Sequence, residues 1–145
     1  MAARVLLDTN VLSELMRPRP DAAVLAWFAA HGPQVQFMVS AVTQAEILLG
    51  IALLPIGKKR RALTGVARTM FEQEFHGSNL AFDDLAAIEY AEIVAARTRS
   101  GRPISVEDAQ IAAIAVRHGV PLATRNTKDF GKVAGLVLID PWAAL

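Results

Sequence analysis

Four acidic residues have types and positions that suit the handling of a divalent cation and a phosphate. Asp8 directly follows a short apolar strand, Glu46 lies in the first turns of the helix after the second strand, and Asp108 lies in the first turn of a later helix. Asp129 follows the fourth predicted strand. A right-handed parallel fold brings such positions to one rim of its sheet. Crowded carboxylates repel one another, and a divalent cation relieves that repulsion.

The chemistry that such a cluster supports is hydrolysis of a phosphodiester. Oxygen ligands, without cysteine and without a histidine in any motif, indicate Mg²⁺ or Mn²⁺ rather than zinc. Such a metal orients a phosphate, activates water and stabilises the developing negative charge. We expect Asp8 and Asp108 to be the core ligands, with Glu46 as a third ligand that positions or deprotonates water. Asp129 is the fourth candidate catalytic acid.

Each acid also has a purely structural interpretation as a helix cap. Asp8 is placed to cap the helix after it, and the segments 43–46 and 105–108 have the form of a capping box. Acids near helix N-termini are also favoured by the helix dipole. The surroundings of Glu46 and Asp108 favour the site interpretation, because both lie in otherwise apolar segments, where acids are rare unless they are paired or bind metal.

The composition is that of a globular chain. The 145 residues are 53% hydrophobic and 20% charged, which excludes a disordered or low-complexity chain. The chain has no cysteine, which excludes a disulfide scaffold, a thiolate zinc site and a cysteine nucleophile. The net charge of +1 does not by itself indicate a nucleic-acid binder. The sequence has neither a signal peptide nor an apolar run long enough to span a membrane, so we expect a cytoplasmic protein.

Short apolar strands alternate with helices along the chain. Strands are expected at residues 4–7, 36–39, 79–82, 121–123 and 136–139, and helices around 11–16 and 21–30 and over 43–54, 58–75, 83–99 and 105–118. Because most strands lack polar alternation, the sheet should be parallel and covered on both faces. We expect an α/β fold, a three-layer α/β/α sandwich with a parallel four- to five-stranded sheet, as a single domain over residues 1–145.

Apolar spacing predicts which faces of two later helices are buried. The helix over 83–99 should bury Leu85, Ile88, Ile93 and Val94. The helix that Ser105 opens is apolar almost throughout and should be nearly wholly buried.

Two groups of basic residues are candidates for contact with RNA. Lys58 and Lys59 open a helix whose first four residues are all basic, which the helix dipole disfavours, so this segment is either a solvated face or a contact for phosphates or an acidic partner. Arg97, Arg99 and Arg102 cluster before the turn that leads toward the third acid, where they are placed to steer a phosphate or to lie on a solvated surface.

The ordered motifs resemble those of the PIN-domain nucleases, specifically the VapC-type toxins of toxin–antitoxin modules and their FitB-like branch. The resemblance runs nearly end to end, through residues 6–14, 40–50, 108–113, 122–126 and 140–142. A lone Asp-Thr-Asn is a weak signal, whereas the complete set in this order and spacing is specific. The resemblance implies a three-layer sandwich with Mg²⁺- or Mn²⁺-dependent endoribonuclease activity.

The resemblance also implies roles for particular residues. Asp8, Glu46 and Asp108 match the three main acidic positions of the family. Its fourth acid commonly stands where this chain has Asn126, an uncharged residue that still offers a carbonyl oxygen. Asp129, three residues further on, replaces the missing acid if the loop starts a helical turn.

Three further polar residues match positions that support the acids. Thr9 and Thr124 match hydroxyl positions that hold carboxylates in the family, and Asn10 matches a position that closes the loop after the first strand. Each also has a local interpretation, as a cap or turn residue.

By the same resemblance, the chain is a homodimer that cuts RNA and is inhibited by a cognate antitoxin. The antitoxin would block the acidic pocket with a C-terminal segment, and the helices over 43–54 and 58–75 would offer it a groove. One alternative is a PIN-type nuclease that processes RNA without an antitoxin. Another is a non-enzymatic phosphoacceptor signalling domain, although Thr9 follows Asp8 where that class has a second acid, and Ser40 stands where it needs an aspartate.

Overall fold

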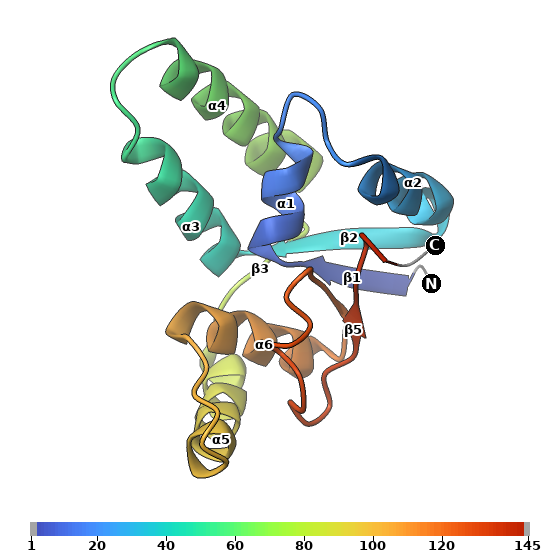
Figure 1. The fold of residues 1–145 in the computed structure, drawn as a ribbon, viewed down its shortest axis with the longest axis vertical. Helices are drawn as coiled ribbons and strands as arrows, with labels where there is room; N and C mark the ends of the chain where they lie inside the picture. Colours follow the sequence, from blue (N-terminus) through green and yellow to red (C-terminus); the bar gives the residue numbers. More distant parts are fainter. Residues whose placement is uncertain (1–2, 144–145) are drawn as a thin grey trace.

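The computed structural model describes residues 3–143, which form a parallel sheet between two layers of helices (Figure 1). The strands are β1 (Ala3–Leu7), β2 (Val35–Ser40), β3 (Asn79–Leu80), β4 (Leu122–Ala123) and β5 (Leu138–Ile139). The α-helices are α1 (Thr9–Leu15), α2 (Ala22–His31), α3 (Ala41–Ala52), α4 (Lys58–Thr69), α5 (Asp84–Arg99) and α6 (Val106–His118). The strand order is β3-β2-β1-β4-β5, and all pairs are parallel. The predicted fold class is confirmed.

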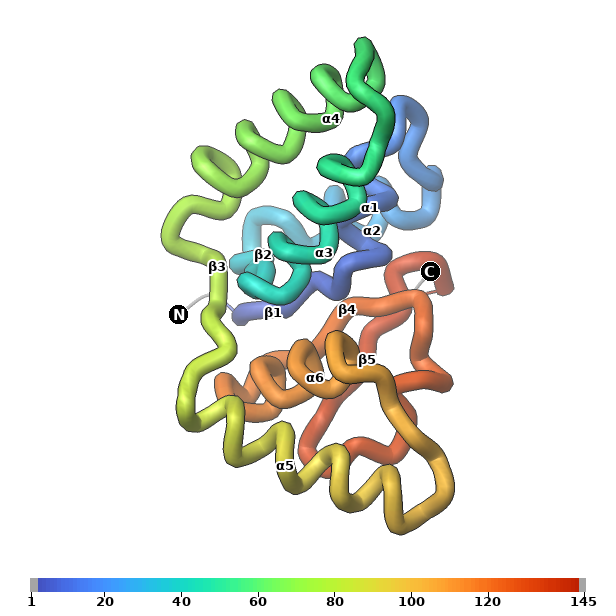
Figure 2. The backbone as a smooth tube through the Cα atoms, turned by 90° about the vertical axis from the view of Figure 1, so that its left-hand side faces the viewer, coloured from blue at the N-terminus to red at the C-terminus, as the bar shows by residue number. Residues whose placement is uncertain are grey.

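The central strand β1 shows why this sheet needs cover on both faces. Leu6 belongs to a core cluster formed mainly with α5 and α6, whereas Val5 and Leu7 belong to a second cluster formed with α1, α2 and α3. Because successive side chains of a strand point to opposite faces, a continuous apolar strand must be covered twice. Figure 1 shows α1 to α4 on one side of the sheet and α5 and α6 on the other, and Figure 2 shows the chain passing from α4 through β3 to α5.

Helices α1 and α3 begin directly after β1 and β2 at the carboxyl edge of the sheet, whereas α6 begins after the turn that follows α5. Asp8 is the N-cap of α1, Ser40 that of α3 and Ser105 that of α6. The predicted capping box over 43–46 is wrong, because α3 begins at Ala41 and the Ser40 hydroxyl accepts the cap hydrogen bond from the Thr43 N–H. Thr43 is therefore inside the helix, and its hydroxyl is available for another partner.

The predicted buried face of α5 is only partly correct. Ile93 is buried, but Leu85 is 44% exposed and Ile88 is 61% exposed. The side chains that face the core are Ala86, Ile93 and Arg97, spaced by seven and four residues as one face of a helix requires. An arginine occupies the last of these positions, which apolar spacing alone does not reveal. The prediction for α6 is confirmed, since residues 111–115 are all buried.

Three predicted elements are shorter than expected. The helix predicted over 58–75 is α-helical only to Thr69, and Met70–Glu74 forms a π-helical turn. The strands predicted over 79–82 and 136–139 shrink to the two-residue β3 and β5. Within residues 3–143, no helix combines the length and the apolar character needed to cross a membrane.

Candidate active site

Three of the four predicted acids meet in one pocket at the carboxyl edge of the sheet. The pocket has a volume of about 540 Å³, and its lining includes Asp8, Glu46, Asp108 and Asn126. These residues come from the end of β1, from α3, from the first turn of α6 and from the loop after β4. Figure 1 shows α1 and α3 starting where β1 and β2 end, so the strand order places the acids together.

The Asp8 carboxylate lies at the centre of a hydrogen-bond network. The side chain is 3% exposed. Its Oδ1 accepts the Thr9 backbone N–H at 2.8 Å, and its Oδ2 accepts the Thr124 hydroxyl at 2.8 Å and the Asn10 amide at 3.2 Å. A carboxylate has about four acceptor positions, so these three bonds leave one on Oδ1. The network fixes the carboxylate and keeps an oxygen lone pair for a further partner.

Burial raises the pKa of Asp8 to about 6 from 3.8. The charges of Asp108 and Glu46 add to this increase, whereas the hydrogen bonds from Thr124 and the Thr9 backbone oppose it. Withdrawal from water penalises the ionised carboxylate, and neighbouring negative charges penalise it further. This electrostatic cost is the one that a bound cation would remove.

Thr9 is the residue that holds Glu46. The Thr9 hydroxyl donates to Glu46 Oε1 at 2.7 Å, and its oxygen lies 2.9 Å from the Thr43 hydroxyl oxygen. Because Thr9 spends its single proton on Glu46, the Thr43 hydroxyl is the donor in the second bond. The Thr43 hydroxyl thus donates to the Thr9 hydroxyl, which donates to Glu46. Thr43 and Glu46 both belong to α3, and Thr9, the first residue of α1, connects them.

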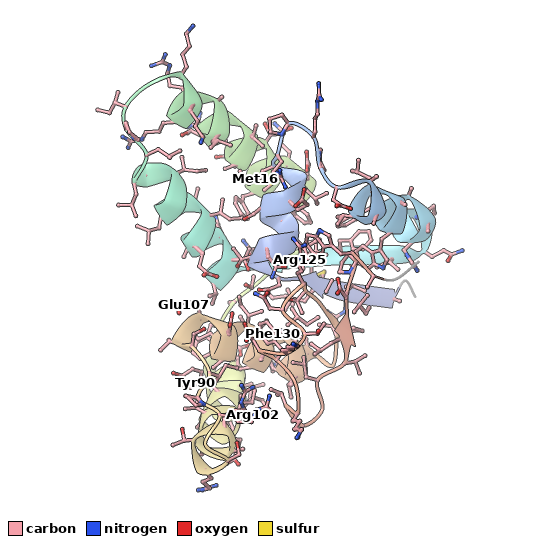
Figure 3. The ribbon with its side chains drawn as sticks, viewed as in Figure 1. Met16, Tyr90, Arg102, Glu107, Arg125 and Phe130 are labelled. Carbon is pink, nitrogen blue, oxygen red and sulfur yellow. The ribbon has the colours of Figure 1, made fainter. Side chains whose placement is uncertain are left out.

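Asp108 is half-buried beside further negative charge. Burial raises the pKa of Asp108, and the charges of Asp129 and Glu107 also raise it, against a hydrogen bond from Ser105. Ser105 caps α6 by accepting the Asp108 backbone N–H at 3.2 Å. Figure 3 shows Glu107 at the start of α6, where this turn begins. The Asp108 carboxylate is thus held at a helix start, as both sequence interpretations expect.

Asn126, rather than Asp129, contributes to the pocket lining. The Asn126 N–H donates to the Thr124 hydroxyl oxygen at 3.0 Å, which ties this loop to the Asp8 network. Asp129 is exposed, and its backbone N–H bonds to the Asn126 carbonyl, so the loop does make the expected turn. The turn brings Asp129 close enough to raise the Asp108 pKa but leaves it outside the lining.

The donor set suits a hard divalent cation that keeps much of its water. The groups at hand are carboxylate, amide and hydroxyl oxygens, the ligands that Mg²⁺ and Mn²⁺ prefer. Within residues 3–143, no three acidic or histidine side chains lie close enough together to enclose an ion by themselves. Mg²⁺ commonly binds through one or two carboxylates plus waters and substrate phosphate, so this set is compatible with it.

Five residues of the pocket lining were not predicted as site residues: Ser13, Glu14, Arg17, Arg125 and Trp142. Glu14 is buried, accepts hydrogen bonds from Arg17 and from the Asp21 N–H, and so joins the end of α1 to the start of α2. An acid six residues after Asp8 in an apolar helix was the available signal. Arg125 and Trp142 follow β4 and β5, the positions where a parallel sheet gathers functional groups.

The structure corrects the predicted basic contacts. Arg97 is 7% exposed, and its guanidinium donates to the backbone carbonyls of Arg102 and Asp129 at 2.7 and 2.9 Å. Arg97 therefore braces the loop after β4, and we withdraw it from the RNA-binding candidates. The pocket lining includes neither Arg99 nor Arg102, and Figure 3 shows Arg102 well away from Arg125.

An apolar groove opens directly onto the acidic pocket. It has a volume of about 460 Å³ and is lined by α1, α3 and α4, with Ile47, Ile51, Leu54 and Leu63 among its residues. Thr9, Ser13, Arg17 and Glu46 line both hollows, so the two are continuous. Lys59 lines the groove, whereas Lys58 is exposed on α4 outside both hollows.

Comparison with known proteins agrees with this geometry. Residues 5–136 match the PIN domain family. The chain is 41% identical over 138 residues to the VapC ribonuclease Y4jK of Sinorhizobium fredii, covering 95% of this chain and 97% of that protein. It is 38% identical over 138 residues to toxin FitB of Neisseria gonorrhoeae, covering 95% of this chain and 98% of that protein.

Comparison with solved structures also finds toxin–antitoxin proteins. A chain from the structure of FitAB bound to a DNA fragment superposes with a TM-score of 0.84 at 38% identity, with 95% of each chain covered. A chain of FitAcB from Neisseria gonorrhoeae gives a TM-score of 0.80 at 36% identity, covering 96% of this chain and 99% of that chain. The chain belongs to the PIN-domain family. Its similarity to the VapC and FitB proteins extends over almost its whole length.

Proposed function

We propose that this protein is a Mg²⁺- or Mn²⁺-dependent endoribonuclease, the toxin of a toxin–antitoxin pair. The observation that carries the proposal is the buried Asp8 carboxylate, whose pKa is raised by burial and by Glu46 and Asp108 in a pocket at the sheet edge. A protein has no structural need for three acids at such a place, because each destabilises the ionised form of the others. The names of the VapC and FitB relatives support ribonuclease activity and a toxin role.

Each residue of the pocket has a distinct part in this reaction. Asp8 and Asp108 would hold the metal, which when bound supplies charge for the phosphate and a more acidic water. Glu46 would position the water or take its proton: Thr9 fixes Oε1, and among residues 3–143 Oε2 accepts no hydrogen bond. Asn126 would add a neutral oxygen ligand in place of a fourth acid.

The remaining polar residues would orient these groups. Thr124 and Asn10 both donate to Asp8 Oδ2, and they bond to each other at 3.2 Å. Such a support restricts the rotation of the carboxylate, so its free lone pair keeps one direction. Asp129 would act through its charge on Asp108 rather than as a ligand.

The groove beside the pocket is the proposed seat of the antitoxin. Its apolar lining suits one face of a helix or an extended apolar segment, and its opening onto Glu46 would let a basic residue of that segment enter the acidic pocket. The similar structures include a FitAB complex, which supports a partner of this kind. We also propose a homodimer, as the family resemblance implies. A PIN nuclease without an antitoxin would leave this groove exposed.

A phosphoacceptor function has less support from the geometry. The Ser40 hydroxyl, at the position where that class needs an aspartate, is used in the cap of α3. The Asp8 carboxylate is also enclosed by three hydrogen bonds, which restricts its attack on a phosphoryl group.

Cleavage of bulk transfer and ribosomal RNA by the purified protein tests the proposal. We expect discrete fragments with Mg²⁺ or Mn²⁺, none with EDTA, and none from Asp8→Asn or Asp108→Asn. Asp129→Asn is the matched control and should keep most of the activity, because Asp129 lies outside the lining. Equal cleavage by wild type, Asp8→Asn and Asp108→Asn would contradict the proposal.

A further inference from the structure

An arginine and a tryptophan form a pair on the rim of the acidic pocket. The Arg125 guanidinium carbon lies 5.1 Å from the centre of the Trp142 ring, and both residues line the pocket. Arg125 follows β4 and Trp142 follows β5, so the pairing of these strands brings the two side chains together. Figure 3 shows Arg125 near the ends of the strands, beside the start of α1.

The backbone of Arg125 is tied to the site. Its N–H donates to Asn10 Oδ1 at 3.2 Å, and the preceding residue, Thr124, donates its hydroxyl to Asp8. Arg125 therefore stands one residue from the central network, and its Cα position is fixed by that network.

Among the residues that the structure describes, Arg125 is the unpaired cation of this pocket. Two arginines line it, and the guanidinium of the other, Arg17, bonds to both carboxylate oxygens of Glu14. Within residues 3–143, the exposed Arg125 side chain has neither an ion pair nor a hydrogen bond. A guanidinium carries five N–H donors, and stacking on a ring leaves the donors at its edge unused.

The Trp142 ring restrains the position of this guanidinium. The Trp142 ring is itself partly buried against the core cluster on the α1 side, and the backbone N–H of Trp142 donates to Asp140 Oδ1 at 2.9 Å. A cation over an aromatic face gains about 0.5–2 kcal/mol, depending on its exposure. The pair thus pre-orients the guanidinium and lowers the entropic cost of a later contact.

We propose that Arg125, held by Trp142, binds a backbone phosphate of the RNA beside the one that is cut. The inference rests on the proposed function and names a substrate-binding residue for it. The acids Asp8, Glu46 and Asp108 repel a polyanion, and a fixed arginine at their rim offsets that repulsion where the chain enters. Arg125 is thereby a substrate-contacting residue, and Trp142 is a positioning residue that acts through it.

Salt-dependent RNA binding tests this role, because each phosphate contact releases counterions and adds about 0.7 to the slope of log Kd against log salt. The probe is a fluorescein-labelled pool of random single-stranded RNA of about 20 nucleotides, since phosphate contacts do not depend on sequence. All proteins carry Asp8→Asn, so that the RNA stays intact, and binding is followed by anisotropy.

We expect Arg125→Gln to raise Kd roughly tenfold and to lower the salt slope by about 0.7. Arg4→Gln is the charge-matched control: Arg4 lies in β1 near its amino end, opposite the pocket, and should leave the slope unchanged. Trp142→Leu should raise Kd less than Arg125→Gln, and the double variant should bind no more weakly than Arg125→Gln alone.

Three outcomes would overturn parts of this account separately. An equal slope in the parent and in Arg125→Gln overturns the phosphate contact while leaving the nuclease proposal intact. A double variant that binds more weakly than Arg125→Gln shows that Trp142 contacts RNA by itself, which overturns its positioning role. RNA that binds no version of the protein, together with absent cleavage by wild type, contradicts the proposed function itself.

Discussion

The Thr9 hydroxyl donates to Glu46 Oε1 at 2.7 Å, which connects the first residue of α1 to the acid of α3 across 37 positions of sequence. The backbone N–H of Thr9 also donates a hydrogen bond to Asp8 Oδ1. One threonine therefore sets the relative position of two acids whose joint action the proposed reaction requires. Four expected outcomes follow from this and the neighbouring contacts.

Thr9→Val should reduce RNA cleavage by roughly 10- to 100-fold, the usual cost of losing a group that orients a catalytic or metal-binding side chain. Valine keeps the shape and the backbone N–H to Asp8 but releases Glu46 and leaves the Thr43 hydroxyl without its acceptor. The free energy of unfolding should fall by only about 1 kcal/mol. Thr9→Ser is the control and should retain activity; equal activity of the valine and serine variants would contradict the role of this hydroxyl.

Thr124→Val should move the acidic limb of the pH–activity profile to higher pH. The Thr124 hydroxyl lowers the pKa of Asp8 by bonding to its charged form, so its removal raises that pKa above about 6. More of the Asp8 carboxylate is then protonated at any given pH, and the ionised form needed for metal binding appears later in the titration. Single-turnover cleavage rates between pH 5 and 8 measure this shift, with Thr124→Ser as the control. An unmoved limb in the valine variant would refute the assignment.

In the absence of divalent cations, the contribution of Asp8 to the free energy of unfolding should be smaller at neutral pH than at mildly acidic pH. Its folded pKa, about 6, is higher than 3.8, so the folded state binds the proton more tightly than the unfolded state does. The resulting stabilisation is complete below pH 4 and is lost as the pH rises through about 6, by on the order of 2–3 kcal/mol. Asp108, whose pKa is also raised, acts in the same direction.

Urea unfolding of the wild type and Asp8→Asn in EDTA at pH 4.5 and pH 7 measures this dependence. The free energy of unfolding of the wild type should fall relative to that of Asp8→Asn as the pH rises. A difference between the two proteins that is the same at both pH values would contradict the assigned pKa.

Arg97→Ala should destabilise the fold by about 2–4 kcal/mol, because it removes a buried side chain whose guanidinium donates to carbonyls of the turn after α5 and of the loop after β4. Arg99→Ala, at an exposed position two residues further on, is the control and should change stability by no more than about 0.5 kcal/mol. Equilibrium denaturation compares the two. If Arg97→Ala instead remains stable and weakens RNA binding, the bracing role is wrong and the original sequence interpretation is right.

The sequence predicts much of this architecture because local signals agree with the global fold. Apolar strands such as β1 require two covering layers, and caps such as Asp21 and Ser105 mark helix starts. In a parallel sheet these signals suffice to bring Asp8, Glu46 and Asp108 to one edge. The family resemblance adds the chemistry, which spacing alone leaves open between helix capping and metal binding.

The contacts that the sequence does not reveal are those between distant segments. Arg97 lies in the last turn of α5, where arginine is usually solvated, and only the packing of α5 against the loop after β4 buries it. The bond from Thr9 to Glu46 depends on how α1 packs on α3, and the stacking of Arg125 on Trp142 depends on the register of β4 and β5. Each requires the relative placement of two elements, which residue spacing within either element cannot supply.

The central claim is that the carboxylates of this pocket bind a divalent cation. Mn²⁺ binding, followed by electron paramagnetic resonance as the ion is titrated into the protein, tests it most directly because the readout needs no RNA. We predict saturable binding by the wild type and by Asp129→Asn, and a loss of at least tenfold in affinity in Asp8→Asn and in Asp108→Asn. Absent binding by the wild type, or equal binding by all four proteins, would contradict the claim and leave the acids as helix caps.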